Sequence, residues 1–159
     1  MASLLIITPV EKLQPEINKV AKTMESIPGV YLSLNKTQKS AEEALKKAGV
    51  KTDKLFFIDC VTSEKIRDDV LHIRPERLDL LSSAVTEFVR DIKGPKFILI
   101  DAISTLLIYN DENKVAKFVK EITECADAND VAVIALSPST RGEELLNKIF
   151  NFFDSVEER

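Results

Sequence analysis

The carboxylate of Asp101 is placed where it could bind a ligand or a metal ion. Asp101 ends the run Phe97-Ile98-Leu99-Ile100, which has no polar residue on either face and is typical of a strand buried inside a parallel sheet. Ligands of such sheets bind at the carboxyl ends of the strands, where a carboxylate can hold a water of a magnesium ion that bridges phosphates. Alternatively, Asp101 caps the following turn together with Ser104 and Thr105. Both interpretations stay open on spacing alone.

Other reactive residue types are scattered. His72 is the only histidine, and Cys60 and Cys125 lie far apart without a Cys-x-x-Cys pair, so no metal site is expected. The two cysteines are expected to be small buried residues. Asp59 ends another apolar run and is expected to cap the turn that follows it.

The elements that position these residues follow from short apolar runs. They predict buried strands at 4–7, 30–34, 54–59, 97–100 and 131–136. Two weaker segments, 70–73 and 152–156, are expected to be short edge strands.

Helical periodicity fills the intervals. Helices are expected after Pro15, after the capping box that Ser40 and Glu43 form, from Pro75 to Gly94, over 112–129, and after a second capping box at Thr140 and Glu143. Strands that alternate with helices predict an α/β fold: a three-layer α/β/α sandwich with a mostly parallel sheet of five or six strands. The length of 159 residues suits a single domain over residues 1–159.

Composition and net charge indicate which partners and which cellular location to expect. A net charge of −4 does not favour nucleic acid as a partner, and no apolar run is long enough to cross a bilayer. Two cysteines without a signal peptide indicate the cytoplasm. Abundant Lys, Glu and Ile with scarce Gln is typical of heat-loving or archaeal proteins.

With this order of elements, the chain resembles the RecA/KaiC group of P-loop ATPase domains, and KaiC most. Residues 100–107, Ile-Asp-Ala-Ile-Ser-Thr-Leu-Leu, resemble the Walker B strand and its flank, residues 75–85 the preceding helix, and 131–137 the strand with the sensor residue, here Ser137. The resemblance covers about residues 1–157. It implies a RecA/KaiC-like core, a nucleotide and magnesium near Asp101, and side-by-side assembly near residues 106–109.

Two family motifs are missing. The phosphate-binding loop needs Gly-x-x-x-x-Gly-Lys-[Ser/Thr], but residues 8–15 read Thr-Pro-Val-Glu-Lys-Leu-Gln-Pro, with no glycine and with Lys12 as the only basic residue. KaiC-like ATPases carry a Glu pair after the second strand, where this chain has Asn35-Lys36, and neither residue is a suitable base. The sequence therefore predicts a degenerate domain, a pseudo-ATPase.

Two functions from different classes follow. The first is a non-catalytic regulatory or protein-interaction module, with no cofactor and with a protein partner or a second copy of itself. The alternative is a nucleotide-binding, ATPase-like enzyme or sensor with an atypical phosphate site, in which Asp101, Ser104 and Lys12 would bind the nucleotide or its magnesium. A small-molecule sensor that uses the strand-end crevice is not separable from the first by sequence.

Overall fold

The computed structural model describes residues 3–61, 70–139 and 142–159. In this part of the chain, seven strands form one sheet: β1 (Ser3–Thr8), β2 (Gly29–Ser33), β3 (Leu55–Asp59), β4 (Val70–His72), β5 (Phe97–Asp101), β6 (Ala132–Pro138) and β7 (Ser155–Glu158). The sheet order is β4-β3-β2-β5-β6-β1-β7, and every pairing is parallel.

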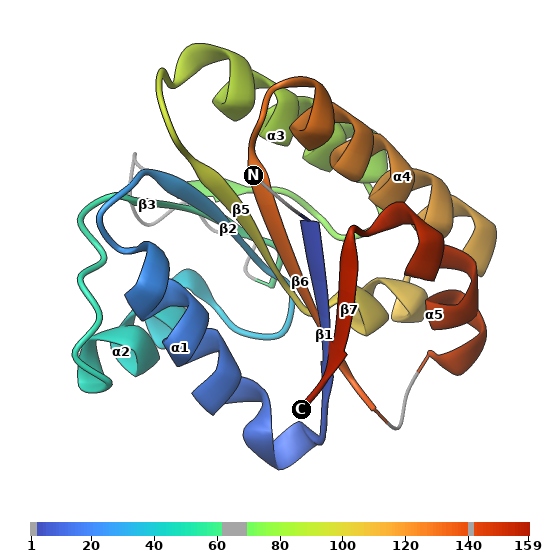
Figure 1. The fold of residues 1–159 in the computed structure, drawn as a ribbon, viewed down its shortest axis with the longest axis horizontal. Coiled ribbons are helices and arrows are strands. Elements are labelled where there is room, and N and C mark those ends of the chain that lie inside the picture. The colour runs from blue at the N-terminus through green and yellow to red at the C-terminus, as the bar shows by residue number, and fades with distance from the viewer. Residues whose placement is uncertain (1–2, 62–69, 140–141) are drawn as a thin grey trace.

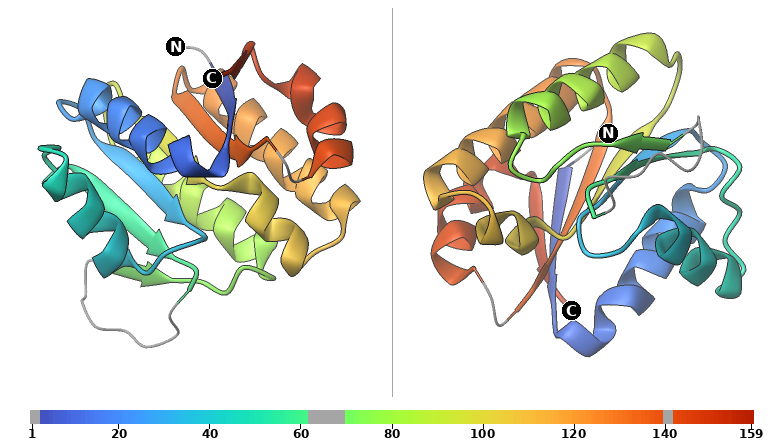
Figure 2. Two further views of the ribbon diagram at one scale, coloured as in Figure 1. Left: turned by 90° about the horizontal axis from the view of Figure 1, so that it is seen from below. Right: turned by 180° about the vertical axis from the view of Figure 1, so that it is seen from behind.

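Helices cover both faces of the sheet (Figures 1 and 2). α1 (Leu13–Met24) and α2 (Gln38–Lys47) cover one face, and α3 (Leu78–Asp91), α4 (Glu112–Ala128) and α5 (Glu143–Ile149) cover the other. Three 3₁₀ turns, η1 (Val10–Lys12), η2 (Ile103–Ile108) and η3 (Phe150–Phe152), complete the described elements. The predicted three-layer α/β sandwich is confirmed, but with seven parallel strands rather than five or six.

The layers arise from alternation along the buried strands. On β5, Ile98 and Ile100 pack with the α3–α4 layer, whereas Phe97 and Leu99 pack with the α1–α2 layer. Each strand inside the sheet therefore belongs to two apolar cores, which is why its polar residues lie at or near its ends, as Ser33, Asp59 and Asp101 do.

Helix α2 begins earlier than predicted. Thr37, rather than Ser40, is its N-cap, and its side chain accepts a hydrogen bond of 3.1 Å from the backbone N–H of Ser40. The carboxylate of Asp59 accepts a second bond, of 2.8 Å, from the N–H of Gln38. A tertiary partner thus satisfies a free amide of the first turn and moves the start of the helix.

Other boundaries also differ from the predictions. Pro75 does not open α3, which begins at Leu78, because the Pro75 carbonyl accepts a hydrogen bond of 3.0 Å from the side chain of Asn110. The last strand begins at Ser155 rather than at 152, because Phe153 is buried in the core and Asp154 is bonded to Ser3 on β1. The capping box predicted at Thr140 lies outside the described residues.

Candidate functional site

Asp101 is completely buried at the carboxyl end of β5, and three side chains surround its carboxylate. The hydroxyl of Tyr31 donates a hydrogen bond of 2.6 Å to Oδ2, and the amide of Asn35 donates one of 3.2 Å to Oδ1. The ammonium of Lys36 lies 3.6 Å from Oδ2, and its side chain is 29% exposed. A buried carboxylate is stable only with such partners.

Sheet register explains this arrangement. β2 lies next to β5, with Ser33 opposite Asp101, and the N–H of Leu34 donates to the Asp101 carbonyl at 2.9 Å. The hydroxyl of Ser33 then donates to the carbonyl of Lys36, which folds the chain after β2 back on itself. Asn35 and Lys36, the second and third residues after the strand, are therefore placed at the end of β5.

The environment of Tyr31 matches its role as a donor. Burial, and then the negative charge and hydrogen bond of Asp101, raise the pKa of Tyr31 well above its usual value. The phenol keeps its proton, so its hydroxyl stays a donor to the carboxylate.

The expectation that Asp101 caps the next turn is wrong. In the described structure η2 has no side-chain cap, and the hydrogen-bond and ion-pair partners of the Asp101 carboxylate come from β2 and the residues after it. Asp59 does cap its turn as predicted, since its carboxylate accepts 2.8 Å bonds from the N–H groups of Val61 and Gln38.

Of the described contacts of the Asp101 carboxylate, none comes from Lys12 or Ser104. Lys12 is exposed at the end of η1, directly before α1, and β6 lies between β1 and β5. Ser104 is buried in η2. Among the described residues, no hydrogen bond or ion pair joins either side chain to Asp101.

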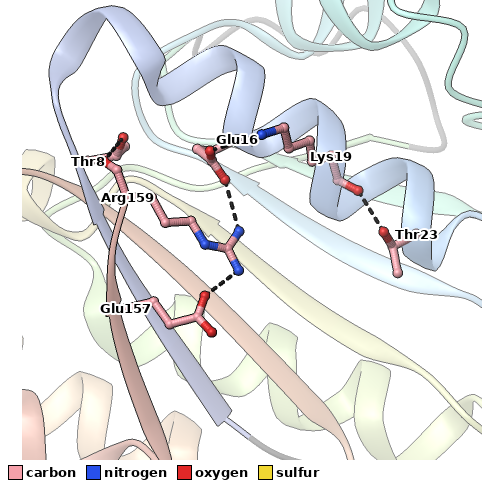
Figure 3. Close-up of polar contacts among 6 residues, drawn as sticks. All are labelled: Thr8, Glu16, Lys19, Thr23, Glu157 and Arg159. Atoms are coloured by element: carbon pink, nitrogen blue, oxygen red, sulfur yellow. Dashed lines mark hydrogen bonds and ion pairs between the residues drawn. The ribbon is translucent and has the colours of Figure 1, made fainter.

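The β1–α1 junction contains an ion pair that sequence reasoning missed (Figure 3). The guanidinium of Arg159 donates to the Glu16 carboxylate at 2.9 Å and also contacts Glu157. Glu16 lies in the first turn of α1, with its side chain only 8% exposed. The hydrogen bond from Arg159 lowers the pKa of Glu16. The Arg159 carbonyl also accepts a bond of 3.0 Å from the hydroxyl of Thr8.

A cavity of about 860 Å³ lies on the other side of Asp101, at the carboxyl ends of β2, β3 and β4. Asn35, which contacts Asp101, also lines this cavity, and so does Thr105 of η2. Cys60 is buried in its wall, and burial raises the pKa of this thiol to about 12, so it stays protonated. The predicted burial of the cysteines is confirmed for Cys60, whereas Cys125 is half-buried.

The described residues offer neither a metal site nor a membrane-spanning helix. They contain no group of three or more His, Cys, Asp or Glu side chains that could hold a metal ion. No helix among them is long and apolar enough to cross a membrane. His72 is half-buried on β4.

Tyr31, Asn35, Lys36 and the pair of Glu16 and Arg159 are the residues whose contacts sequence reasoning missed. A tyrosine inside an apolar strand was a usable signal, because a buried hydroxyl needs a partner. Glu16 and Arg159 are 143 positions apart, and no local pattern connects them.

Comparisons with solved structures identify the fold. A KaiC-like protein of the hyperthermophilic archaeon Pyrococcus horikoshii, PH0186, is 13% identical with a TM-score of 0.71, covering 99% of this chain and 71% of that one. An uncharacterized protein of the same organism, PH0321, solved with an unknown peptide, is 12% identical with a TM-score of 0.76, covering 99% and 76%. A further solved structure, described as an ATPase domain, is 16% identical with a TM-score of 0.66, covering 99% and 68%. The fold is therefore KaiC/RecA-like.

A search of curated proteins found no match. Residues 31–159 match a family that is described only as a family of unknown function, DUF7090. This match includes β2 with Tyr31, the segment with Asn35 and Lys36, and β5 with Asp101, which together form the polar cluster at the end of the sheet. The chain belongs to the DUF7090 family.

Proposed function

We propose that this protein is a non-catalytic KaiC/RecA-like module that regulates or binds a protein partner in the cytoplasm. One observation carries the proposal: the carboxylate of Asp101 is bound by Tyr31, Asn35 and Lys36 of the protein itself. Asn35 and Lys36 stand where the resemblance to KaiC implies a Glu pair, and here they bind the strand-end carboxylate.

The cluster is a poor magnesium site. Magnesium takes oxygen ligands and keeps several of its waters, so it needs a carboxylate with free oxygen atoms and no competing cation. The ammonium of Lys36 lies 3.6 Å from Oδ2 of Asp101 and already compensates its charge. Neither Asn35 nor Lys36 can accept a proton from an attacking water at neutral pH.

The β1–α1 junction does not fit a phosphate either. Backbone amides and cations bind phosphates at a helix start, but Pro9 and Pro15 have no N–H, and the carboxylate of Glu16 adds a negative charge to the first turn of α1. The guanidinium of Arg159 is engaged with Glu16 and Glu157. We therefore propose no ATP, magnesium or other cofactor.

Exposed apolar residues support a protein partner. Ile108 and Tyr109, at the end of η2, are 68% and 51% exposed, so of the apolar run at 106–109 only Leu106 is fully buried. Exposed apolar side chains close together are typical of interaction sites. The structure of PH0321 contains a peptide, which supports a peptide or protein partner for a fold of this kind. A second copy of this chain is the other candidate partner, and the net charge of −4 disfavours nucleic acid.

Equilibrium binding and thermal unfolding with ATP or ADP, each with and without magnesium, test the proposal. A ligand that binds only the folded state stabilises it by about 2.7 kcal/mol at a hundredfold excess over Kd. We expect no shift in the unfolding temperature and no hydrolysis. Magnesium-dependent binding that Lys12→Ala weakens, or turnover that Asp101→Asn abolishes, would instead establish the nucleotide-dependent enzyme or sensor.

The partner is tested separately. Light scattering and affinity capture of the full chain are compared with the variant Ile108→Ser, and Leu80→Ser on α3 serves as a matched control because Leu80 is also exposed. We expect Ile108→Ser to weaken self-association or partner binding and Leu80→Ser to leave both unchanged. Equal behaviour of the two variants would exclude the end of η2 as the interaction site.

A further inference from the structure

The cavity at the carboxyl ends of β2, β3 and β4 has the size of a small-molecule site. Its volume of about 860 Å³ falls within the range of ligand pockets. It lies on the β4 side of Asp101, whereas the β1–α1 junction lies on the opposite side of β5. It is therefore separate from the place where the fold family would hold phosphates.

The walls of the cavity are tied together by hydrogen bonds. The side-chain amide of Asn110 donates to the carbonyls of Pro75 and Leu106 at 3.0 and 3.1 Å, which joins the segment before α3 to η2. The N–H of Ile73 donates to the carbonyl of Asp59 at 3.2 Å and fixes the end of β4. These bonds fix the backbone around the cavity, so ligand binding would need to order only its exposed side chains.

Two hydrogen bonds beside Asp101, from Asn35 to Asp101 and from Thr105 to Asn35, fix which atoms donate and which accept at this wall of the cavity. The Asp101 carboxylate can only accept, so Asn35 must turn its NH₂ group toward it, and the carbonyl oxygen of Asn35 then accepts from the hydroxyl of Thr105. This leaves the second N–H of Asn35 as a donor and the oxygen of Thr105 as an acceptor. Both residues line the cavity. A donor beside an acceptor is complementary to the edge of a carboxamide.

The charges around the cavity are compensated. Arg74 forms an ion pair with Glu76, and both line the cavity. Lys36, which follows Asn35, is paired with Asp101. Each of these cations already has a carboxylate partner, so a charged ligand would gain little here and an uncharged ligand is favoured.

The rest of the lining is largely apolar. Leu34 and Ile73 contribute from directly after β2 and β4, and the exposed Ile108 and Tyr109 contribute from the end of η2 and the residue after it. A ligand with an apolar ring or chain would bury these side chains. Ligand pockets usually combine such apolar walls with a few placed polar groups.

We propose that this cavity binds an uncharged small molecule that has a carboxamide edge and an apolar body. The amide faces Asn35 and Thr105, and the apolar body lies against Ile73, Ile108 and Tyr109. The binding site goes beyond the proposed interaction role and does not depend on it.

Benzamide is a suitable probe, because it joins a carboxamide to an apolar ring. Two-dimensional amide NMR of the full chain, titrated with benzamide into the millimolar range, is expected to show saturable shifts at Asn35, Ile73, Thr105 and Tyr109. Benzoate has the same shape but a negative charge and no N–H donor, and we expect it to bind about tenfold more weakly.

Variants locate the site. Thr105→Val keeps the shape of the side chain but removes the acceptor, and we expect it to weaken benzamide binding about fivefold to tenfold. Thr86→Val on the exposed face of α3 is the matched control and is expected to change nothing. Ile108→Ser is also expected to weaken benzamide binding. Because Ile108 is exposed, this variant should fold, so it tests the site even if Thr105→Val does not fold.

Four outcomes would each overturn the proposal. These are the absence of saturable shifts, shifts that lie away from the cavity, benzoate binding as tightly as benzamide, and unchanged affinity in both Thr105→Val and Ile108→Ser. Detection of ATP binding, or failure to find a protein partner, would overturn the proposed function but leave this proposal standing, so the two failures are distinguishable.

Discussion

The hydroxyl of Tyr31 on β2 donates a hydrogen bond of 2.6 Å to the buried carboxylate of Asp101 on β5, 70 positions later in the chain. This bond joins two central strands of the sheet at the end where a KaiC/RecA-like fold would carry its chemistry. Its removal leaves a buried charge with one donor fewer.

We expect Tyr31→Phe to lower the free energy of unfolding by about 1–3 kcal/mol, the usual cost of leaving a buried polar group with too few partners. Urea unfolding at neutral pH measures the loss. Tyr109→Phe is the matched control, because it removes the same hydroxyl from an exposed position, and about 0.5 kcal/mol or less is expected there. Equal losses in the two variants would mean that the Tyr31–Asp101 bond contributes nothing specific.

The ion pair between Lys36 and Asp101 predicts a strong coupling. We expect Lys36→Met to lower the free energy of unfolding by about 1–3 kcal/mol. This is less than for a fully buried pair, because the Lys36 side chain is 29% exposed. In an Asp101→Asn background the same change is expected to cost about 0.5 kcal/mol or less, since no buried charge remains. A double-mutant cycle by urea unfolding measures this difference.

Lys46→Met is the control for that cycle. Lys46 pairs with Glu42 at 3.7 Å, but its side chain is 64% exposed, so we expect a change of about 0.5 kcal/mol or less. If Lys36→Met proves equally costly with Asp101 and with Asn at that position, Lys36 acts through its packing rather than through its charge.

The Arg159–Glu16 pair predicts a pH-dependent contribution to stability. The hydrogen bond from Arg159 lowers the pKa of Glu16 below its usual 4.5, so the stabilisation is present above pH 4.5 and disappears as the pH falls through the lowered pKa. We expect Arg159→Gln to lower the free energy of unfolding by about 0.5–1 kcal/mol at neutral pH, and by progressively less as the pH falls into the acid range. Thermal unfolding of both proteins across the acid range measures the difference.

Arg90→Gln is the control for the pH series. Arg90 and Asp91 are both largely exposed, so no difference from the native protein is expected at any pH. A cost of Arg159→Gln that stays constant into acid would show that Arg159 stabilises the fold without involving the charge of Glu16.

Gly29 is predicted to tolerate no side chain. A Cβ atom there would lie 2.2 Å from the ring of Phe97, which is fully buried opposite it in the β2–β5 pair. We expect Gly29→Ala to destabilise the protein by about 1–3 kcal/mol through overpacking. Gly49→Ala has open space around it and strains only the backbone, at φ +79, so it separates the two effects. Restored stability in Gly29→Ala/Phe97→Leu would confirm the clash.

Much of the fold was predictable because the strands are buried on both faces. The run Phe97 to Ile100 identified β5, and its terminal carboxylate identified Asp101 as the polar residue at the sheet edge. The segment after β2 was also recognised as abnormal for a KaiC-like protein. Apolar runs and strand ends are local features, and a sequence displays them directly.

The partners of these residues were not predictable. That Asn35 and Lys36 bind Asp101 depends on β2 being the neighbour of β5, which is set by crossovers of the whole chain. The start of α2 shows the same limit, because Ser40 and Thr37 are both favoured N-cap residues and the carboxylate of Asp59, which binds the N–H of Gln38, selects Thr37. The pair of Glu16 and Arg159 depends on β7, whose exposed residues carry only a weak strand signal.

The position of β1 has a consequence for synthesis on the ribosome. β1 precedes the other strands, yet its two neighbours in the sheet are β6 and β7, with Ser3 opposite Val133 and Leu4 opposite Ser155. The early part of the chain must therefore wait with an unpaired apolar strand until these late segments have emerged. Nascent chains cut before β6 are expected to need a chaperone that shields β1, whereas β2, β3 and β5 can pair earlier.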